Sequence, residues 1–313
     1  MAIALNILLL LVGFVLLIKG ADFFVDGSSS VARLIGIPGF VIGLTIVAMG
    51  TSAPEAAVSI AASAQGSNEI AISNIVGSNI FNLLVVAGIC AVIKPYKIER
   101  VMLNRDFPLN TVLCAVLLVM MIIGRSLGLI DGIILLLGII AYVLFVVLSA
   151  LKNRTTEDEE VKKLSPLLSI VFIIGGLAAI ILGGDLVVDN ATALAKELGW
   201  SETFIGLTIV AIGTSLPELV TSIVAARKGE SGLALGNVIG SNIFNILFIL
   251  GLSSTISTIA ISTEAIINAF ILLGITAAVY IPCAIKKGMG RIFGGVCVLG
   301  YVAYTAYLLI TTI

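Results

Sequence analysis

The stretch GLTIVAMGTSAPE at residues 43–55 decides the fold, because it returns almost unchanged as GLTIVAIGTSLPE at residues 206–218. A second stretch, SNIVGSNIFN at 73–82, returns as GNVIGSNIFN at 236–245. Both pairs share one offset, since 218 − 55 and 245 − 82 each equal 163. A fixed long period of this kind is the signature of a duplicated structural unit. The sequence therefore predicts two homologous halves that align without a gap.

The amino-acid composition is that of a membrane protein. Hydrophobic residues make up 59% of the 313 residues and charged residues only 11%, and the mean hydropathy is +1.22. A water-soluble domain of this length does not carry such values. We therefore expect an all-α polytopic protein surrounded by the lipid bilayer. The net charge of −1 gives no footprint for nucleic acid.

Ten segments, five in each half, are long and apolar enough to cross roughly 30 Å of hydrocarbon, which takes about 20 helical residues. The second and the seventh can also be read as re-entrant, since each contains Gly-Thr-Ser-x-Pro. The predicted spans are 3–21, 39–63, 70–93, 107–124, 130–151, 166–184, 203–226, 233–256, 264–285 and 292–312.

The cations are distributed unevenly between the two sides of this layout. With the N-terminus outside, the inner loops hold fifteen of the seventeen Lys and Arg residues, and only Arg125 and Lys196 lie outside, as the positive-inside rule requires. Five spans per half is an odd number, so the second half enters from the opposite side as an inverted-topology repeat. We expect both termini to be extracellular or periplasmic at the cell (inner) membrane. The predicted units are a first five-helix repeat at 1–151, a cytoplasmic linker at 152–165 and an inverted second repeat at 166–313.

The residues that are missing or isolated exclude several kinds of chemistry. Histidine is absent, which removes His-containing zinc sites and Ser-His or Cys-His nucleophile pairs. The four cysteines lie in apolar runs without CxxC spacing, so we interpret them as small core residues rather than disulfides or metal ligands. We expect neither an enzyme nor a bound cofactor.

Two acidic residues, Glu55 and Glu218, lie well inside predicted spans. An ionisable group there costs at least roughly 2.5–3.5 kcal/mol and marks an ion or substrate path by default. The alternative is a protonated or paired structural acid, but no Lys, Arg or His lies at that depth. Four Asp residues also repeat at the offset of 163, near the ends of predicted spans, and we interpret them as solvated or capping residues. They are Asp22, Asp26, Asp185 and Asp189.

Pro54 and Pro217 precede the two glutamates. Proline has no N–H and clashes with the carbonyl four residues back, so each helix should open and free backbone oxygens near 48–51 and 211–214. Loosened backbone at this depth is tolerated only where it faces protein or a water-filled cavity. We therefore predict that backbone carbonyls, hydroxyls and a carboxylate converge at each break.

Polar residues follow helical spacing around both glutamates. Positions i, i+3 and i+7 on one helix and i, i+4 and i+8 on the next share a face. Such oxygen donors suit Na⁺ and Ca²⁺ better than zinc or copper. Helix packing is an equally good reading for Ser59, Ser222 and the glycines at 43, 50, 77, 206, 213 and 240. The two sets are Ser52, Glu55, Ser59, Asn74, Ser78 and Asn82, and Ser215, Glu218, Ser222, Asn237, Ser241 and Asn245.

These residues resemble the calcium/cation antiporter superfamily, whose two α-repeats carry GTS-x-PE and GN-x-x-GSN motifs. The motifs fall within 43–88 and 206–251, and the chain is similar to the prokaryotic Na⁺/Ca²⁺ exchangers of that superfamily. The resemblance implies the sodium/calcium exchanger fold, with the first and sixth helices as the moving pair. It also implies cation ligands at Glu55, Glu218, Ser52, Ser215, Ser78, Ser241, Asn82 and Asn245, with backbone oxygens of Ala48, Thr51, Ala211 and Thr214.

One position departs from that pattern, because several relatives carry Asp where this chain has Asn245. K⁺-dependent exchangers use such an Asp, so the departure argues against K⁺ cotransport. The two carboxylates carry a charge of −2, which one Ca²⁺ or two Na⁺ neutralise, and a third Na⁺ would make the exchange electrogenic.

The expected function is Na⁺/Ca²⁺ antiport by alternating access. We expect the protein to be a monomer. An H⁺-coupled Ca²⁺ antiporter is the alternative, although proton/calcium relatives carry a different acidic motif. A cation channel would lack strict Na⁺ coupling. A membrane hydrolase built on Ser52 or Ser215 would have no base beside its nucleophile.

Overall fold

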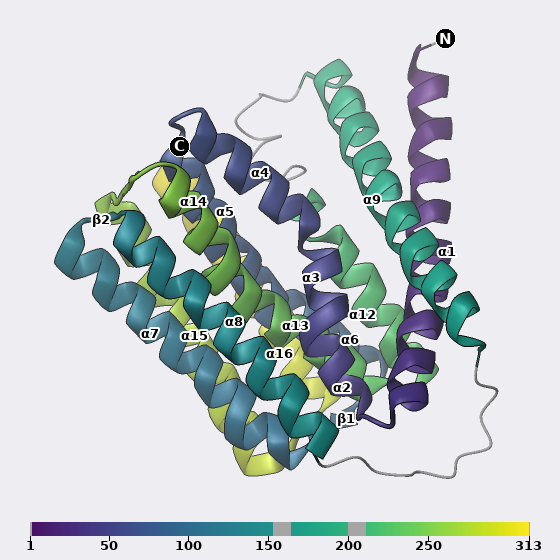
Figure 1. Ribbon diagram of the computed structural model, residues 1–313. Coiled ribbons are helices and arrows are strands. Elements are labelled where there is room, and N and C mark those ends of the chain that lie inside the picture. The colour runs from purple at the N-terminus through teal and green to yellow at the C-terminus, as the bar shows by residue number, and fades with distance from the viewer. Residues whose placement is uncertain (1, 153–163, 200–210, 313) are drawn as a thin grey trace.

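The computed structural model describes residues 2–152, 164–199 and 211–312 as a bundle of helices whose two termini lie at the same end (Figure 1). The elements labelled η are short π-helical stretches. The first half contains α1 (Ala2–Ile35), α2 (Gly39–Ile42), η1 (Gly43–Val47), α3 (Ala48–Thr51), α4 (Ala53–Ala64), α5 (Asn68–Phe81), η2 (Asn82–Val86), α6 (Ala87–Ile93), β1 (Tyr96–Lys97), η3 (Met102–Asp106), α7 (Phe107–Gly124), β2 (Ser126–Leu127) and α8 (Leu129–Lys152). The second half contains α9 (Pro166–Glu197), α11 (Ala211–Gly213), α12 (Leu216–Lys228), α13 (Ser231–Phe244), η5 (Asn245–Ile249), α14 (Leu250–Ile256), β3 (Ile259–Ala260), α15 (Thr263–Lys286), β4 (Gly288–Met289) and α16 (Arg291–Thr312).

The helices confirm an all-helical membrane fold. Within the described ranges, eight helical segments are long and apolar enough to cross a membrane, and the bent pair Gly39–Thr51 plus Ala53–Ala64 makes a ninth. These correspond to nine of the ten predicted spans. The remaining prediction, 203–226, begins outside the described residues, and α12 forms its later part.

Two helices are longer than the hydropathy pattern predicts. The first span was expected at 3–21, yet α1 has 34 residues, and the span expected at 166–184 is the 32-residue α9. At 1.5 Å per residue each is roughly 50 Å long. Charged residues end the apolar run after Ile18, but the helix continues because Ala21, Phe24 and Val25 keep one face fully buried.

The offset of 163 relates helices that run in opposite directions in the bundle (Figure 1). Adding 163 to the bounds of α5, η2 and α6 gives the bounds of α13, η5 and α14. The same holds for β1 and β3. The two halves are therefore inverted copies, as predicted.

Two short antiparallel ribbons join the halves. β1 pairs with β4, with Tyr96 opposite Met289, and β2 pairs with β3, with Ser126 opposite Ala260. Each ribbon therefore takes one strand from each half. The ribbons lie at opposite ends of the bundle (Figure 1).

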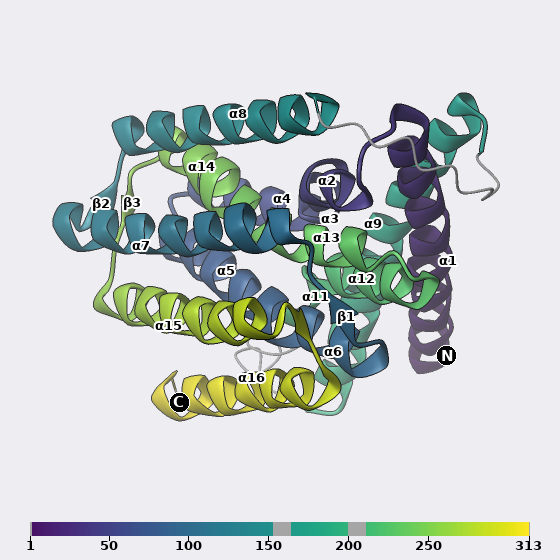
Figure 2. The ribbon, with the colours of Figure 1, turned by 90° about the horizontal axis from the view of Figure 1, so that it is seen from below.

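The centre of the bundle is built from the two segments that carry the repeated GSN motif. In the spans Glu69–Ile93 and Ser231–Ile256, 83% and 94% of the most apolar window is buried, against 11–33% in the other six unbroken spans. Around them α7, α8, α15 and α16 run nearly parallel to one another (Figure 2). These outer helices expose large apolar residues such as Ile130 and Ile285, which is the expected outward surface in lipid.

The long helices α1 and α9 form a pair at the other side of the molecule (Figures 1 and 2). Small residues every seven positions let their backbones approach closely. A Cβ added at Gly20 would lie 2.8 Å from the Gly176 carbonyl oxygen, and one at Gly13 would lie 2.9 Å from that of Gly183. The two backbones therefore meet closely at these glycines, between buried side chains such as Leu17 and Ile180.

Candidate cation site

Each glutamate begins a helix that follows a break. Ser52 (φ −80°, ψ 9°) and Ser215 (φ −91°, ψ 7°) leave the helical region, and proline occupies the first turn of both α4 and α12. The first break bends its helix by 48°. Glu55 and Glu218 lie in the first turn after each break, where the helix dipole favours a carboxylate. The breaks predicted at the two prolines are confirmed, but the Ala48 carbonyl, which was expected to be freed, still accepts the Ser52 N–H.

The two halves exchange hydrogen bonds through these glutamates, both of which are fully buried. The Ser52 hydroxyl donates to Glu218 Oε1 at 2.8 Å, and the Ser215 hydroxyl donates to Glu55 Oε1 at 2.8 Å. Ser78 also donates to Glu55 Oε1, at 2.9 Å. One oxygen of each carboxylate is thus held by a serine of the other half.

The other oxygen of each carboxylate has no hydrogen-bond partner among the residues that the structure describes. Glu55 Oε2 and Glu218 Oε2 are buried and unpartnered, and so are the Oδ1 atoms of Asn82 and Asn245. Leaving a buried polar atom unpaired costs about 1–3 kcal/mol, and more for a charged group. Four such acceptors come from the two inverted halves, and no N–H or O–H in the described part of the chain satisfies them. A bound cation would complete this arrangement.

A cluster of four asparagines orients those amide oxygens. Asn82 Nδ2 donates to Asn242 Oδ1 at 3.2 Å, and Asn245 Nδ2 donates to Asn79 Oδ1 at 3.0 Å. Asn79 and Asn242 in turn donate to each other's backbone carbonyl, each at 3.2 Å. The NH₂ groups of Asn82 and Asn245 face this cluster, so the Oδ1 atoms of the same two amides point away from it and accept no hydrogen bond from it.

Asn79 and Asn242 were missed in the sequence analysis. Both lie in the repeated GSN triplet, and that repetition was the available signal. They do not lie on the i, i+4, i+8 helix face from which the candidate cation ligands were chosen.

The next polar residues hold the helices together. Asn74 donates to Ser59 at 3.0 Å, and Asn237 donates to Ser222 at 3.0 Å. The hydroxyls of Ser59 and Ser222 are therefore occupied by packing partners, which favours the helix-packing reading of both.

The backbone oxygens expected as ligands lie beside the two breaks. The Ala48 carbonyl accepts the Ser52 N–H at 3.1 Å and the hydroxyls of Thr51 and Ser241 at 3.5 Å each. Thr51 also donates to Asn237 Oδ1 at 3.0 Å, whereas the Thr214 hydroxyl has no partner within the described ranges. Ala211 lies in α11, directly before the second break.

The aspartates near α1 take a different place from the one expected. Asp22 and Asp26 were placed near a helix end, but α1 continues to Ile35, so they lie within the helix. Lys228 Nζ lies 2.7 Å from Asp26 Oδ1 and 3.4 Å from Asp22 Oδ1. These acids pair with α12 and do not join the glutamates.

The donor set is that of a hard-cation site. In the part of the chain that the structure describes, no group of three or more His, Cys, Asp or Glu residues could hold a metal. The four cysteines are free and buried, as predicted. Two carboxylates among neutral hydroxyl and amide oxygens suit Na⁺ or Ca²⁺.

Fold and site together define a membrane transporter of cations, and known proteins agree. Residues 5–149 and 168–310 match the family described as sodium/calcium exchanger protein. The chain is 35% identical over 347 residues to the sodium/calcium exchanger MaX1 of Methanosarcina acetivorans, covering 98% of this chain and 99% of MaX1. It is 40% identical over 258 residues to the inner membrane protein YrbG of Escherichia coli, covering 80% and 79%.

A solved structure of the sodium-calcium exchanger NCX_Mj, soaked with Na⁺ and Ca²⁺, superposes with a TM-score of 0.86 at 34% identity. The match covers 97% of this chain and 98% of that one. The chain belongs to the sodium/calcium exchanger family. It is a multi-pass membrane cation antiporter of that family and not an enzyme.

Proposed function

We propose that this chain exchanges Na⁺ for Ca²⁺ at the site between the two repeats. The observation that carries the proposal is the set of four buried, unpartnered oxygens on Glu55, Glu218, Asn82 and Asn245. The names of the relatives MaX1 and NCX_Mj support the choice of ions. The proposed ligands are side-chain oxygens of Glu55, Glu218, Ser52, Ser215, Ser78, Ser241, Asn82 and Asn245, with backbone oxygens of Ala48, Thr51, Ala211 and Thr214.

Charge explains why the two ions compete. Ca²⁺ takes six to eight oxygen ligands in flexible geometry, and one Ca²⁺ neutralises the two carboxylates. Two Na⁺ do the same, and a third leaves the loaded site at +1. Both ions draw on the same carboxylates, so a site filled with Na⁺ releases Ca²⁺. Exchange with three Na⁺ moves net charge across the membrane.

Alternating access requires part of the protein to move past the site. The pair α1 and α9 is suited to this because its glycines bring the two backbones into close contact, so that the two helices can move as one unit. Inverted repeats supply two related conformations by exchanging the roles of the halves. We propose that this pair moves against the remaining helices, which carry the ligands.

The proposed orientation follows the charge distribution. Lys94, Lys286 and Arg291 lie at the end of the bundle opposite the termini, and this end is assigned to the cytoplasm. The termini are then extracellular or periplasmic, with 1–151 and 166–313 as the two units and 152–165 as a cytoplasmic linker. The name of YrbG supports an inner-membrane location. The monomer contains all proposed ligands, so we propose a monomeric transporter.

Uptake of ⁴⁵Ca²⁺ into proteoliposomes tests the function. We expect uptake to follow an imposed Na⁺ gradient, to stop when that gradient is collapsed and to be lost in Glu55→Gln. The control is Glu69→Gln, which removes an exposed acid from the first turn of α5. Uptake driven by a pH gradient alone would instead support H⁺ coupling, and uptake indifferent to both gradients would contradict antiport.

A further inference from the structure

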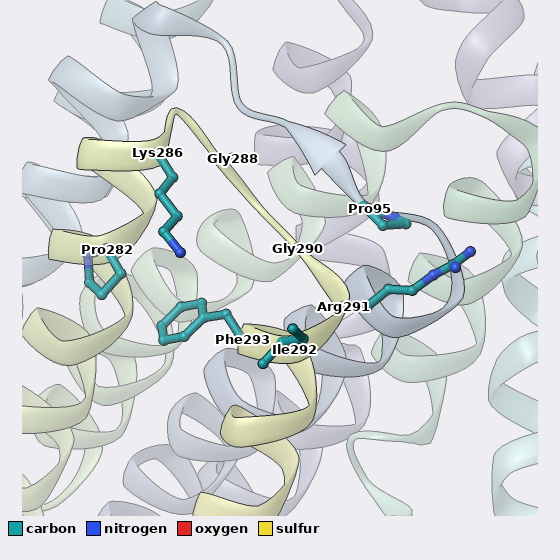
Figure 3. A pocket seen from close by; sticks show the side chains of 8 residues that line it. All are labelled: Pro95, Pro282, Lys286, Gly288, Gly290, Arg291, Ile292 and Phe293. Carbon is teal, nitrogen blue, oxygen red and sulfur yellow. The ribbon is translucent and has the colours of Figure 1, made fainter.

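The turn between α15 and α16 carries a cavity that the proposed transport site does not use. Its volume is about 360 Å³. The Lys286 side chain reaches from the end of α15 toward the Phe293 ring, and Arg291 lies on the side nearer Pro95 (Figure 3). The cavity therefore combines cationic and apolar side chains. Its lining residues are Pro95, Pro282, Lys286, Gly288, Gly290, Arg291, Ile292 and Phe293.

The cavity lies at a boundary between membrane and water. The candidate span Thr263–Lys286 ends at it and the span Arg291–Leu308 begins at it. The neighbouring side chains of Ile285 and Ile292 are 75% and 87% exposed. Because they belong to the ends of membrane spans, this exposed apolar surface faces acyl chains.

The β1–β4 ribbon brings two basic connections together, and Lys286 and Arg291 of one of them line the cavity. It joins the connection that carries Lys94, Lys97 and Arg100 to the connection that carries Lys286, Lys287 and Arg291. All six side chains are exposed, and none forms an ion pair with any residue that the structure describes. The acid in these connections, Glu99, has its Oε1 beside Gly232 of α13. The two connections therefore hold six cations and one acid, Glu99.

The inverted copy shows that the fold does not need these cations. At the offset of 163, the six positions correspond to Ser257, Ala260, Thr263, Ile123, Gly124 and Gly128, which are all uncharged. Their ribbon, β2–β3, nevertheless forms. The positive-inside rule accounts for cations in these loops, but it does not account for a cavity among them. The residues that shape the cavity also differ in the copy, since Pro95, Pro282 and Phe293 correspond to Thr258, Val119 and Ile130.

We propose that this cavity binds the headgroup of an anionic phospholipid. Its phosphate lies beside Lys286, with Arg291 at the rim of the cavity (Figure 3), and its acyl chains lie along Ile285 and Ile292. Basic pockets between transmembrane helices bind anionic headgroups, and Lys and Arg bind phosphate through charge-assisted hydrogen bonds. The exposed apolar surface beside the cations selects a lipid over a free phosphate ion.

Native mass spectrometry of the full chain in detergent tests the proposal. The protein is titrated with phosphatidylglycerol, with phosphatidylcholine of the same acyl chains and with inorganic phosphate. We expect one phosphatidylglycerol to be retained in preference to the other two. Lys286→Gln/Arg291→Gln should weaken that binding by about thirtyfold, since each cation near an anionic headgroup contributes roughly a factor of five.

Two control variants distinguish binding at this cavity from general electrostatic attraction of anionic lipid to the protein. Lys152→Gln/Arg227→Gln removes the same charge elsewhere, and Figure 2 shows the end of α8 far from α16, so binding should be unchanged. Gly290→Leu fills the cavity without changing charge, because a Cβ there meets no atom within 4 Å, and it should weaken binding. Gly295→Leu, equally open, should not.

Equal weakening by both charge pairs, or equal retention of the two lipids, would overturn the proposal. Retention of inorganic phosphate as tight as that of the lipid would show an anion site in its place. Unaltered binding in Gly290→Leu would remove the cavity from the account. Thermal unfolding of each variant confirms that the folded protein is compared.

Discussion

The Ser52 hydroxyl donates a 2.8 Å hydrogen bond to Glu218, a residue 166 positions further along the chain. The bond ties the helix break of one repeat to the carboxylate of the other. Its inverted counterpart joins Ser215 to Glu55. The two bonds hold the ligand-bearing helices of the two halves together, so these helices can stay one unit while α1 and α9 move.

Removing one crossed hydroxyl should weaken Ca²⁺ transport. A hydrogen bond to a charged group contributes about 1.5–3 kcal/mol, and 1.4 kcal/mol corresponds to tenfold. We therefore expect Ser52→Ala to raise the KM for ⁴⁵Ca²⁺ uptake about tenfold or more. Ser253→Ala is the control, since Ser253 is buried with an unpartnered hydroxyl in α14. Equal KM values in the two variants would contradict the role of Ser52.

Substitutions of Asn245 test whether transport needs the unpartnered Oδ1 oxygen of this side chain. Asn245→Leu keeps the approximate size and removes the oxygen, so Na⁺-driven uptake should be lost. Asn245→Asp keeps an oxygen there, so exchange should persist. The Leu and Asp variants of Asn82 should rank in the same order of Na⁺-driven uptake. Retained uptake in both Leu variants would show that these amides do not bind the ion.

The asparagine cluster should position its neighbours without binding the ion itself. Asn79→Leu removes the acceptor for Asn245 Nδ2 and leaves buried groups unpaired, at about 1–3 kcal/mol. We expect a lower unfolding temperature together with a higher KM for Ca²⁺. Asn79→Asp retains the acceptor and should restore most of the KM. A loss of stability with an unchanged KM would reduce Asn79 to a structural residue.

Adjacent glycines on α9 provide a matched test of close helix packing. A Cβ at Gly176 would lie 2.6 Å from the Phe24 backbone nitrogen, whereas one at Gly175 meets nothing within 4 Å. Overpacking costs typically about 1–3 kcal/mol, so Gly176→Ala should lower the unfolding temperature and slow transport. Gly175→Ala should do neither, because alanine favours the helix. Similar behaviour of the two variants would contradict the tight α1–α9 contact.

The repeat made much of this architecture predictable. A common offset, two prolines and two buried acids were enough to locate the helix breaks and the inverted topology. The hydrogen bond between Glu55 and Ser215 joins residues 160 positions apart, and no local pattern predicted that contact.

Other features depend on packing that the sequence pattern does not carry. Hydropathy ended α1 near Ile18, although buried residues extend the helix to Ile35. The role of Asn79 and Asn242 depends on contacts across the interface between halves. The π-helical stretches that begin at Asn82 and Asn245 likewise arise without Pro or another local signal, and such stretches are frequent at functional sites.

Diffraction from crystals soaked in Ca²⁺ tests the central claim most directly. We predict anomalous density between the two carboxylates, at the Ca–O distance of about 2.3–2.6 Å from Glu55 Oε2 and Glu218 Oε2, and its loss on transfer to high Na⁺. Density that is absent at saturating Ca²⁺, or that lies only away from these oxygens, would contradict the account.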